Sequence, residues 1–386
     1  MACGGGPCAY ITLIRHGETL ANHMRLLQGH SDSPLTVHGT SQIEALGRYW
    51  GARQKGEQCP SDGGPSQTLE PPITLLVASP VGRANKTADA IARNCIDLDV
   101  HASDIKMSND DADLPTASRS SFDPDFEAAL LQEIGKATLD PASLSYCLDA
   151  GLAERDFGYM ESTRGGIYVP YQQSSGNISN GAVYNKRGKG NGETKAVFEQ
   201  RVKNVGRRWI QLASKAAVLS GDSGKPSVAS SRGTDRSATA GPVHVVLVTH
   251  GLWLKTFLAL FLGANTQPPF AANTGFFTLE LRAPRLFFRM EKGSILESSR
   301  EVHNRDKSST VTRREVARAE PNAARPDRIS LLPGLQLISK DQTPHLAGVK
   351  RQCGGAGSIA EDRSQSKLQS FFGSSPSKKR KEVSPD

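Results

Sequence analysis

The chain has 386 residues, of which 37% are hydrophobic, and a formal net charge of +8. This length allows one large domain with appendages or two domains, and the low apolar fraction indicates a folded part diluted by polar stretches. Residues 311–386 hold 14 Lys and Arg against 8 Asp and Glu, a net +6, which leaves about +2 for the rest. A basic core with direct sequence-specific nucleic-acid binding is therefore not expected.

The cysteines and the apolar runs indicate where the protein resides. The six cysteines are scattered without a C-x-x-C pair, so we expect no metal site. We expect no signal peptide and no contact with a membrane, because no basic start precedes an apolar run and no run approaches roughly 18 apolar residues. The cytoplasm, the nucleus or both are the expected location.

The first predicted element is a buried strand over Tyr10–Ile14, which leads into the motif L-I-R-H-G-E-T. Arg15 can bind a phosphate oxygen, Gly17 allows close approach of the backbone, and His16 can supply a nucleophilic imidazole nitrogen. The alternative is a structural histidine at a strand end.

A polar stretch follows this motif, and within it Asn22, Gln28 and Gly29 can place amide donors near a phosphate. Thr36 is the predicted N-cap of a helix over residues 39–53, whose apolar residues recur with helical spacing.

A second buried strand is predicted over Ile73–Ala78, followed by a helix over residues 84–94. Arg83 lies at the start of that helix, beyond the carboxyl end of a strand. Ligand sites of open α/β sheets gather at that edge. The alternative is an ordinary arginine on a helix surface.

The residues 97–145 have a weak pattern and are interpreted as a partly disordered insertion around one helix, residues 126–134. A short strand over residues 145–152 precedes Glu154, a carboxylate that could donate a proton to a leaving oxygen.

The second half of the folded part repeats the alternation of helix and strand. A loop ends in Gly192 and Glu193, a helix spans residues 195–219, and residues 220–241 have the composition of a linker. A strand over Val243–Thr249 then leads to His250. The remaining predictions are a helix over 252–262, a strand over 276–282, and strands near 286–290 and 295.

This alternation predicts an α/β fold, a three-layer α/β/α sandwich with a mostly parallel central sheet, inserted loops and a disordered C-terminal tail. In such a sheet His16 and His250 end neighbouring strands at the same edge. Each alone could be an ordinary histidine, but together with Arg15 and Arg83 they indicate a phosphate pocket.

Several motifs in order resemble the histidine phosphatase superfamily in its phosphoglycerate-mutase-like branch: L-I-R-H-G-E-T, Q-G-x-x-D-x-P-L-T, S-P-x-x-R-A-x-x-T-A, E-R-x-F-G and V-T-H-G. The resemblance covers residues 8–304 as the catalytic domain, with insertions at 97–145 and 220–241. The segment from Gly192 to Thr194, Arg201 and the later N-T-G are similar to TIGAR-type fructose-2,6-bisphosphatases. Two departures are Glu18, where acid phosphatases have a different pattern, and Tyr159 to Ser162, where mutases continue G-L-N-K.

The resemblance implies a metal-independent phosphatase without a cofactor, acting on a small phosphorylated substrate. His16 would attack phosphorus and form a phosphohistidine, and Glu154 would protonate the departing oxygen. Arg15, Arg83 and His250 would stabilise the equatorial oxygens. The implied substrate-binding residues are Asn22, Gln28, Gly29, Gly192 and Glu193.

Residues 305–386 are predicted to form a disordered basic tail. At 365–372 it reads Q-S-K-L-Q-S-F-F, which resembles a PIP box, the peptide that docks on the sliding clamp PCNA. Its binding residues would be Gln365, Leu368, Phe371 and Phe372. The basic cluster at 378–381 suits an importin groove. An accidental cluster in a solvated tail is the alternative.

Three functions remain open from the sequence. The first is a phosphomonoester hydrolase acting on a sugar phosphate such as fructose 2,6-bisphosphate. The second is a phosphoglycerate mutase or a phosphoprotein phosphatase. The third is a catalytically inactive PCNA-binding adaptor, which the complete set of charged site residues disfavours.

Overall fold

The computed structural model describes residues 9–57, 70–96, 124–164, 166–168, 190–222, 241–263, 271–282 and 334–350. Within them the main sheet comprises β1 (Ala9–Arg15), β2 (Leu75–Ala78), β3 (Ser145–Leu148), β6 (Val243–Thr249), β7 (Phe276–Leu281) and β8 (Leu335–Gln342). The helices are α1 (Leu20–His23), α2 (Val37–Gln54), α3 (Gly82–Cys95), α4 (Pro124–Leu139), α5 (Lys195–Asp222) and α6 (Gly251–Leu262).

Shorter elements connect them. The 3-10 turns are η1 (Pro141–Ser143), η2 (Ala150–Leu152), η3 (Gly158–Met160) and η5 (Pro344–Leu346). A small antiparallel hairpin is made of β4 (Thr163–Arg164) and β5 (Ile167–Tyr168).

The sheet has the order β3-β2-β6-β1-β7-β8. Strands β3, β2, β6 and β1 are parallel to one another, β7 runs antiparallel to β1, and β8 runs antiparallel to β7. The central strands are apolar on both faces, as parallel strands covered on both sides should be. In β1, for example, Ile11 and Leu13 belong to one core cluster and Ile14 to the other.

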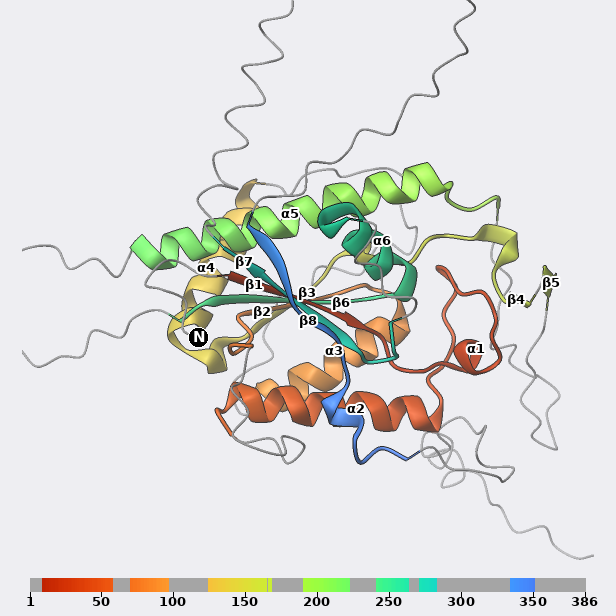
Figure 1. Ribbon diagram of the computed structural model, residues 1–386, viewed down its shortest axis with the longest axis horizontal. Coiled ribbons are helices and arrows are strands. Elements are labelled where there is room, and N and C mark those ends of the chain that lie inside the picture. The colour runs from red at the N-terminus through yellow and green to blue at the C-terminus, as the bar shows by residue number, and fades with distance from the viewer. Residues whose placement is uncertain are drawn as a thin grey trace, which may run out of the picture.

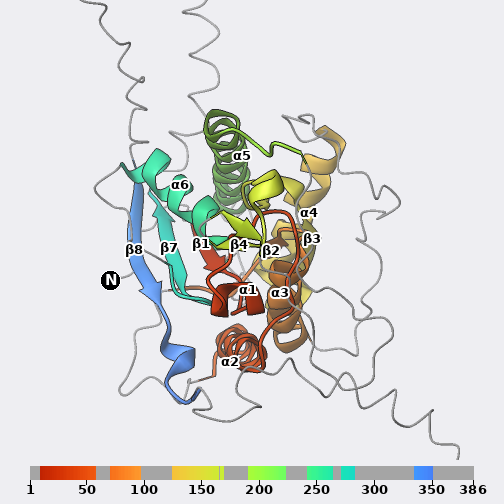
Figure 2. The same cartoon turned by 90° about the vertical axis from the view of Figure 1, so that its right-hand side faces the viewer.

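Helices cover both faces and make the three-layer α/β/α sandwich that the sequence predicts (Figures 1 and 2). On one face α4, α5 and α6 pack on the sheet through residues such as Ile134, Trp209 and Trp253. On the other face α2 and α3 pack through residues such as Trp50 and Ile91. The predicted mostly parallel α/β sandwich is therefore confirmed.

Thr36 is the N-cap of α2, as predicted, and its hydroxyl accepts the Gly39 amide proton.

The packing of α2 explains why a glycine, Gly17, follows His16. A Cβ on Gly17 would lie 2.6 Å from Ile43 Cγ2 of α2. Gly17 thus lets the strand end pack closely against this helix.

The prediction of a wholly disordered tail from residue 305 is wrong for β8. This strand pairs with β7 along the edge of the main sheet, and Leu335 and Leu337 pack against the core. The backbone N–H and C=O groups of β8 form hydrogen bonds with β7, a partner that is distant in the sequence and that the local sequence does not indicate. The PIP-box-like residues 365–372 and the basic cluster 378–381 lie outside the described residues, as do the strands predicted near 286–290 and 295.

The segment 97–145 is also not simply an insertion. Residues 97–123 lie outside the described part, but α4 buries Leu130 and Ile134 in the main core. Lys215 of α5 pairs with Glu127 of α4 at 2.8 Å. The second half of this segment therefore belongs to the sandwich. In the described part of the chain, no helix is both long and apolar enough to cross a bilayer.

Candidate active site

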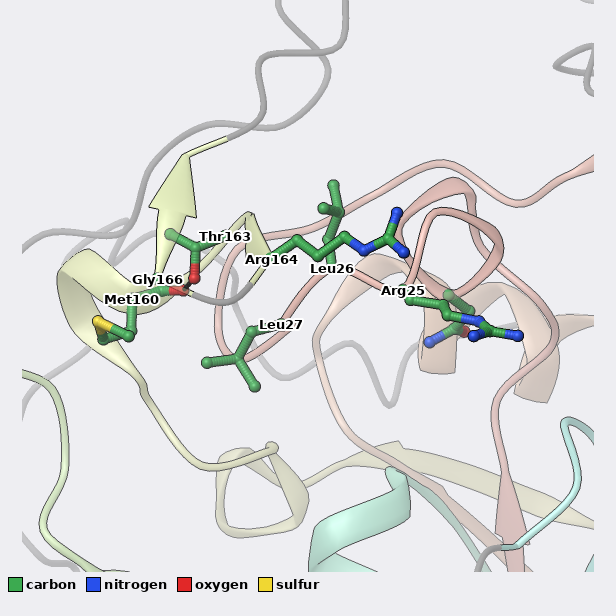
Figure 3. Close-up of a pocket in the computed structure, with 8 residues that line it drawn as sticks. Arg25, Leu26, Leu27, Met160, Thr163, Arg164 and Gly166 are labelled. Atoms are coloured by element: carbon green, nitrogen blue, oxygen red, sulfur yellow. Dashed lines mark hydrogen bonds between the residues drawn. The ribbon is translucent and has the colours of Figure 1, made fainter.

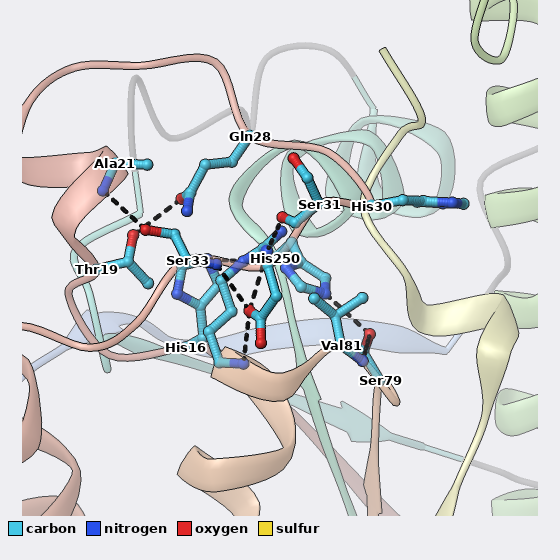
Figure 4. Close-up of polar contacts among 12 residues, drawn as sticks. His16, Thr19, Ala21, Gln28, His30, Ser31, Ser33, Ser79, Val81 and His250 are labelled. Carbon is cyan, nitrogen blue, oxygen red and sulfur yellow. Dashed lines mark hydrogen bonds and ion pairs between the residues drawn. The ribbon is translucent and has the colours of Figure 1, made fainter. Parts of the chain in front are cut away.

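The parallel strands β1, β2 and β6 are neighbours, so their carboxyl ends meet at one edge of the sheet. Each is followed by residues of the candidate site: β1 by His16, β2 by Ser79 and Arg83, and β6 by His250. The sheet order thus brings together residues that are up to 234 positions apart, and the imidazole rings of His16 and His250 lie 5.2 Å apart (Figure 4).

The tautomer of His16 follows from its two contacts. Its Nδ1 lies 2.8 Å from the Gly17 carbonyl oxygen, which can only accept, so Nδ1 carries the proton. Its Nε2 accepts the Nε–H of Arg83 at 3.2 Å. Burial, and then the charges of Arg83 and Arg15, hold the pKa of His16 well below its ordinary value of 6.5. The imidazole is therefore neutral, with its Nε2 lone pair directed into the site.

Arg83 is held in place by backbone oxygens. Its Nη2 donates to Gly29 O at 2.7 Å and its Nη1 donates to Ser31 O at 3.0 Å. Asp32 lies 3.7 Å away and its charge supports the protonated form, although burial lowers the pKa of Arg83. The guanidinium is thus a fixed cation beside His16.

Glu161 organises the loop that supplies those oxygens. Its carboxylate accepts the amide protons of His30 at 2.9 Å, Ser31 at 2.7 Å and Phe157 at 3.1 Å. A Cβ on Gly29 would lie 2.0 Å from Glu161 Oε1, so only glycine fits there. Glu161 could not be predicted as a site residue, because nothing in the neighbouring sequence distinguishes a buried carboxylate from an exposed one.

His250 is the N-cap residue of α6, and its Nε2 lies 2.9 Å from the Ser79 hydroxyl (Figure 4). Burial, followed by the charge of Arg83, keeps its pKa well below 6.5. The Ser79 hydroxyl and Nε2 share this hydrogen bond, and Nδ1 of the ring has no partner among the described residues.

Arg15 approaches from the end of β1. Its Nη1 donates to Ala271 O at 2.6 Å. The buried nitrogens of this region without a hydrogen-bond partner among the described residues are Arg15 Nε, Gln28 Nε2, His30 Nε2 and His250 Nδ1. Buried donors without partners cost free energy. An oxyanion would satisfy them and would match the charge of Arg15 and Arg83.

Glu154 is buried where η2 ends. Its two oxygens accept the amide protons of Arg155 at 3.0 Å and Leu252, in the first turn of α6, at 2.9 Å. Burial raises its pKa above the ordinary value, while these hydrogen bonds and the charges of Arg83 and Arg15 oppose the rise. The positive charges of Arg83 and Arg15 therefore act on the pKa of the Glu154 carboxyl group.

The amide side chains form a connected cluster near the site. Gln28 Oε1 accepts from Thr19 Oγ1 and from Asn22 Nδ2, each at 3.0 Å. Asn273 Nδ2 donates to Asn22 Oδ1 at 3.2 Å and to His16 O at 3.0 Å. Asn22 and Gln28 therefore belong to one hydrogen-bonded cluster, which Asn273 connects to the backbone of His16.

The structure gives Glu193 a different setting from the predicted substrate contact. Its carboxylate forms a two-pronged ion pair with Arg201 at 3.0 and 2.7 Å. Arg201 also donates to the carbonyl oxygens of Ala153 and Glu154. Glu193 thus supports the loop that carries Glu154. Gly192, with φ +71°, packs against Gly158.

Two residues from the segment predicted to be disordered contact the turn at residues 271–275, which lies next to the site. Asp341 Oδ1 accepts the Ala272 amide proton at 3.0 Å, and His345 Nε2 lies 2.9 Å from the Thr274 hydroxyl. The turn that they hold supplies the Arg15 contact at Ala271 and the His16 contact at Asn273. No signal in the sequence points to these contacts.

In the part of the chain that the structure describes, no three His, Cys, Asp or Glu side chains group in a way that could hold a metal ion. The charge at the candidate site is supplied by Arg15 and Arg83, with neutral histidines between them. Cys95 and Cys147 are buried, and burial raises the pKa of each thiol to about 12, so neither is a reactive nucleophile.

Residues 11–58, which contain β1, His16 and α2, match the family model described as the histidine phosphatase superfamily (branch 1). Relatives named probable phosphoglycerate mutase GpmB, from Klebsiella pneumoniae and Salmonella arizonae, are 40% identical over 85 residues. That match covers 22% of this chain and 31% of the length of each relative. Over these residues the chain is similar to the histidine phosphatase superfamily and to relatives named as phosphoglycerate mutases, and it spans about a third of the length of those relatives.

Solved structures with similarity to this chain include YhfR from Bacillus stearothermophilus, with 18% identity, coverage of 72% of this chain and 93% of that one, and a TM-score of 0.37. A putative alpha-ribazole-5'-P phosphatase from Escherichia coli has 16% identity, coverage of 72% and 92%, and a TM-score of 0.35. A mycobacterial glucosyl-3-phosphoglycerate phosphatase has 15% identity, coverage of 71% and 90%, and a TM-score of 0.34.

Proposed function

We propose that this protein is a phosphomonoester hydrolase that works through a phosphohistidine at His16. The observation that carries the proposal is the state of that side chain. Its Nδ1 proton is bound by Gly17 O, and its Nε2 lone pair lies beside the fixed guanidinium of Arg83. A phosphoryl group that replaces the Arg83 contact would meet an unprotonated nucleophile inside a cradle of N–H donors.

The reaction has two steps. In the first, Nε2 of His16 forms a bond to phosphorus, the bond to the substrate oxygen breaks, and Glu154 gives that oxygen its proton. In the second, Glu154 takes a proton from water, whose oxygen attacks phosphorus and releases inorganic phosphate and neutral His16. Arg15 and Arg83 balance the charge on the equatorial oxygens and neutral His250 contributes a polar contact, so the proposed reaction needs no metal.

A panel of phosphorylated metabolites tests the proposal. The 386-residue chain is expected to release phosphate from small sugar phosphates, with fructose 2,6-bisphosphate as the first candidate, and to yield an acid-labile phosphohistidine at His16. The His16→Ala variant should lose turnover and retain its far-UV circular dichroism spectrum. Undiminished phosphate release by this variant would end the proposal.

A second candidate is a phosphoglycerate mutase, favoured by the relatives that are named as such and are 40% identical over 85 residues. A mutase returns the phosphoryl group to another oxygen of the substrate and releases little phosphate. Incubation with 3-phosphoglycerate separates the two, because a mutase yields 2-phosphoglycerate and a phosphatase yields glycerate. Phosphate release from phosphoproteins is a further arm of the same assay.

We also propose that the tail recruits the enzyme to PCNA, through Gln365, Leu368, Phe371 and Phe372, or to the nucleus through residues 378–381. The support is the spacing of these residues alone. A peptide of residues 361–386 should bind PCNA, and Phe371→Ala with Phe372→Ala should remove the binding. Absence of binding by the unaltered peptide would end this part of the proposal.

A further inference from the structure

The turn directly before β7 contacts both Arg15 and His16. The carbonyl oxygen of Ala271 accepts a proton from Arg15 Nη1 at 2.6 Å, and Asn273 Nδ2 donates to His16 O at 3.0 Å. The backbone of the turn adds a further hydrogen bond, in which Thr274 N donates to Arg15 O at 3.0 Å. The conformation of this turn therefore determines where the Arg15 guanidinium and the backbone of His16 lie.

The turn has a backbone conformation that its own sequence does not favour. Thr274 has a left-handed backbone, with φ of +60°, and β-branched residues rarely adopt this region. Asp341, near the end of β8, also has a positive φ, of +46°. Such conformations in residues other than glycine cost energy, and they persist where the surrounding structure fixes them. The turn therefore needs contacts from other parts of the chain to keep its shape.

Asp341 fixes one side of the turn. Its Oδ1 accepts the Ala272 amide proton at 3.0 Å, and a Cβ on Gly275 would lie only 2.3 Å from the same oxygen. Burial lowers the pKa of Arg15, and the negative charges of Glu154 and Asp341 oppose that fall. Asp341 is thus a hydrogen-bond acceptor for the turn and a counter-charge for the arginine that the turn contacts.

His345 of η5 fixes the other side of the turn. Its Nε2 lies 2.9 Å from Thr274 Oγ1, and the hydroxyl proton of Thr274 is donated to Asn273 O at 2.6 Å. Because a hydroxyl has one proton and a carbonyl oxygen can only accept, the donor in the first contact is the Nε2–H of His345. The imidazole is buried, and its centroid lies 5.9 Å from the ring of Tyr49 and 6.3 Å from that of Phe276. The ring is therefore packed in one place.

The hydrogen bonds continue from the turn to the amide cluster. Asn273 Nδ2 donates to Asn22 Oδ1 at 3.2 Å, and Asn22 Nδ2 donates to Gln28 Oε1 at 3.0 Å. Asn22 also lines a cavity of about 480 Å³, together with residues such as Leu26 and Met160 (Figure 3). A connected set of contacts thus extends from β8 and η5 through the turn to the wall of this cavity.

We propose that Asp341 and His345 are positioning residues of the proposed reaction, which act on it through the turn before β7. They hold the turn in the shape that orients the Arg15 guanidinium and the backbone of His16. Loss of either contact lets the turn relax and moves these groups, and a displacement of about 1 Å can lower a rate roughly 10²-fold. The inference rests on the proposed function and gives β8 and η5 a role in its chemistry.

The test uses one variant that removes each contact and one that keeps it, with p-nitrophenyl phosphate as substrate. Asp341→Gly removes the carboxylate and suits the left-handed backbone, whereas Asp341→Asn keeps an oxygen acceptor. His345→Phe keeps an aromatic ring without an N–H, whereas His345→Gln keeps an N–H donor. In the Gly and Phe variants kcat should fall about tenfold or more, and in the Asn and Gln variants it should stay within about threefold of the wild type. KM should change less than kcat, because positioning matters most in the transition state.

Leu337→Ala is the matched control for a purely structural role. Leu337 lies on the same strand, but it pairs with Leu279 and packs against the core. Its variant should lower the midpoint of urea unfolding and leave kcat within about twofold of the wild type, because the contacts to the turn remain. A kcat that follows the unfolding midpoint in every variant, this control included, would overturn the inference. Wild-type kcat in both Asp341→Gly and His345→Phe would also overturn it.

Binding of orthovanadate separates this inference from the proposed function. Vanadate resembles a phosphoryl group during transfer, and calorimetry with the 386-residue chain and its variants needs no turnover. A wild type that binds vanadate but releases no phosphate, with weaker binding in the Gly and Phe variants alone, would overturn the proposed function and support the inference. Phosphate release with equal vanadate affinity in all variants would overturn the inference and leave the proposed function intact. A wild type that neither binds vanadate nor releases phosphate would contradict both.

Discussion

At the scale of single residues, His16 and Glu154 lie in the same buried site, and their pKa values shift in opposite directions. Burial and two arginines lower the pKa of the imidazole, and burial raises the pKa of the carboxyl group. A nucleophile must be unprotonated and a general acid must be protonated. The site therefore moves both groups toward the protonation state that the proposed reaction needs.

The dependence of kcat/KM on pH should show both groups. It should fall on the acid side as His16 gains a proton, at a pH well below 6.5, and on the alkaline side as Glu154 loses its proton, at a pH above 4.5. Glu154→Gln should lower kcat by roughly 10²–10⁴-fold and remove the alkaline limb. With p-nitrophenyl phosphate, whose leaving group needs less protonation, the loss should be smaller. An equal loss with both leaving groups would contradict the role of Glu154 as an acid.

Glu161 permits a second test at this scale. Its carboxylate accepts three backbone amide protons and thereby sets the carbonyl oxygens that hold Arg83. Glu161→Ala leaves those amides without a partner and should lower the free energy of unfolding by about 3 kcal/mol. It should also lower kcat, because the Arg83 guanidinium loses its fixed position. Urea unfolding and steady-state kinetics measure the two effects, and a variant with unchanged stability would contradict the account.

At the scale of secondary-structure elements, β8 and η5 differ most from the sequence-based prediction, because they are ordered elements within a segment that was predicted to be disordered. Strand β8 completes the sheet next to β7, and Asp341 and His345 hold the turn that contacts Arg15 and His16. Glu70 also accepts hydrogen bonds from Thr278 of β7 and Ser339 of β8, and it pairs with Arg53 of α2 at 2.9 Å. The edge strand therefore supports both the sheet and the site.

Truncation shows whether β8 is part of the folded unit. A chain that ends at residue 350 retains β8 and η5 and should fold with wild-type phosphatase activity. A chain that ends at residue 333 leaves β7 with an unpaired edge, so it should aggregate or lose activity. Size-exclusion chromatography and phosphate release compare the two. Full activity of the shorter chain would show that the site does not need this strand.

At the scale of the whole molecule, four histidines that are buried in the described part of the chain make stability depend on pH. Burial lowers the pKa of His16 and His250 well below 6.5, and that of His244 and His345 to about 4. The unfolded chain binds a proton near pH 6.5 and the folded chain does so only at lower pH. Their contribution to stability is therefore complete above 6.5 and is lost as the pH falls toward 4.

Urea unfolding at pH 7.5, 6 and 5 measures this effect. Below pH 6.5 each histidine should reduce the free energy of unfolding by about 1.4 kcal/mol per pH unit, until its folded-state pKa is reached. His345→Gln removes one of the four histidines. Below pH 6.5 it should reduce the slope of the free energy of unfolding against pH by about 1.4 kcal/mol per pH unit. Equal stability of the wild type at pH 7.5 and pH 5 would contradict the prediction.

Much of the central fold could be predicted from local patterns. The apolar runs of β1 and β6 and the helical spacing of α2 are properties of neighbouring residues, so the sequence alone indicates these elements. Because a histidine directly follows each of β1 and β6, a parallel sheet was enough to place His16 and His250 together. The motif of residues 13–19 also carries the likeness to the family.

Only the tertiary structure decided the contacts that depend on residues distant in sequence. Strand β8 is half-exposed and mixed in composition, and its partner β7 ends more than 50 residues earlier. Glu161, Asp341 and His345 act through backbone groups, which any residue could supply and which therefore leave no sequence pattern. The sequence by itself determined the chemical groups at the strand ends, because those lie beside the apolar runs that position them. The enclosure that gives these groups their charge states was decided by the folded chain, because burial is a property of the whole packing and not of any one segment.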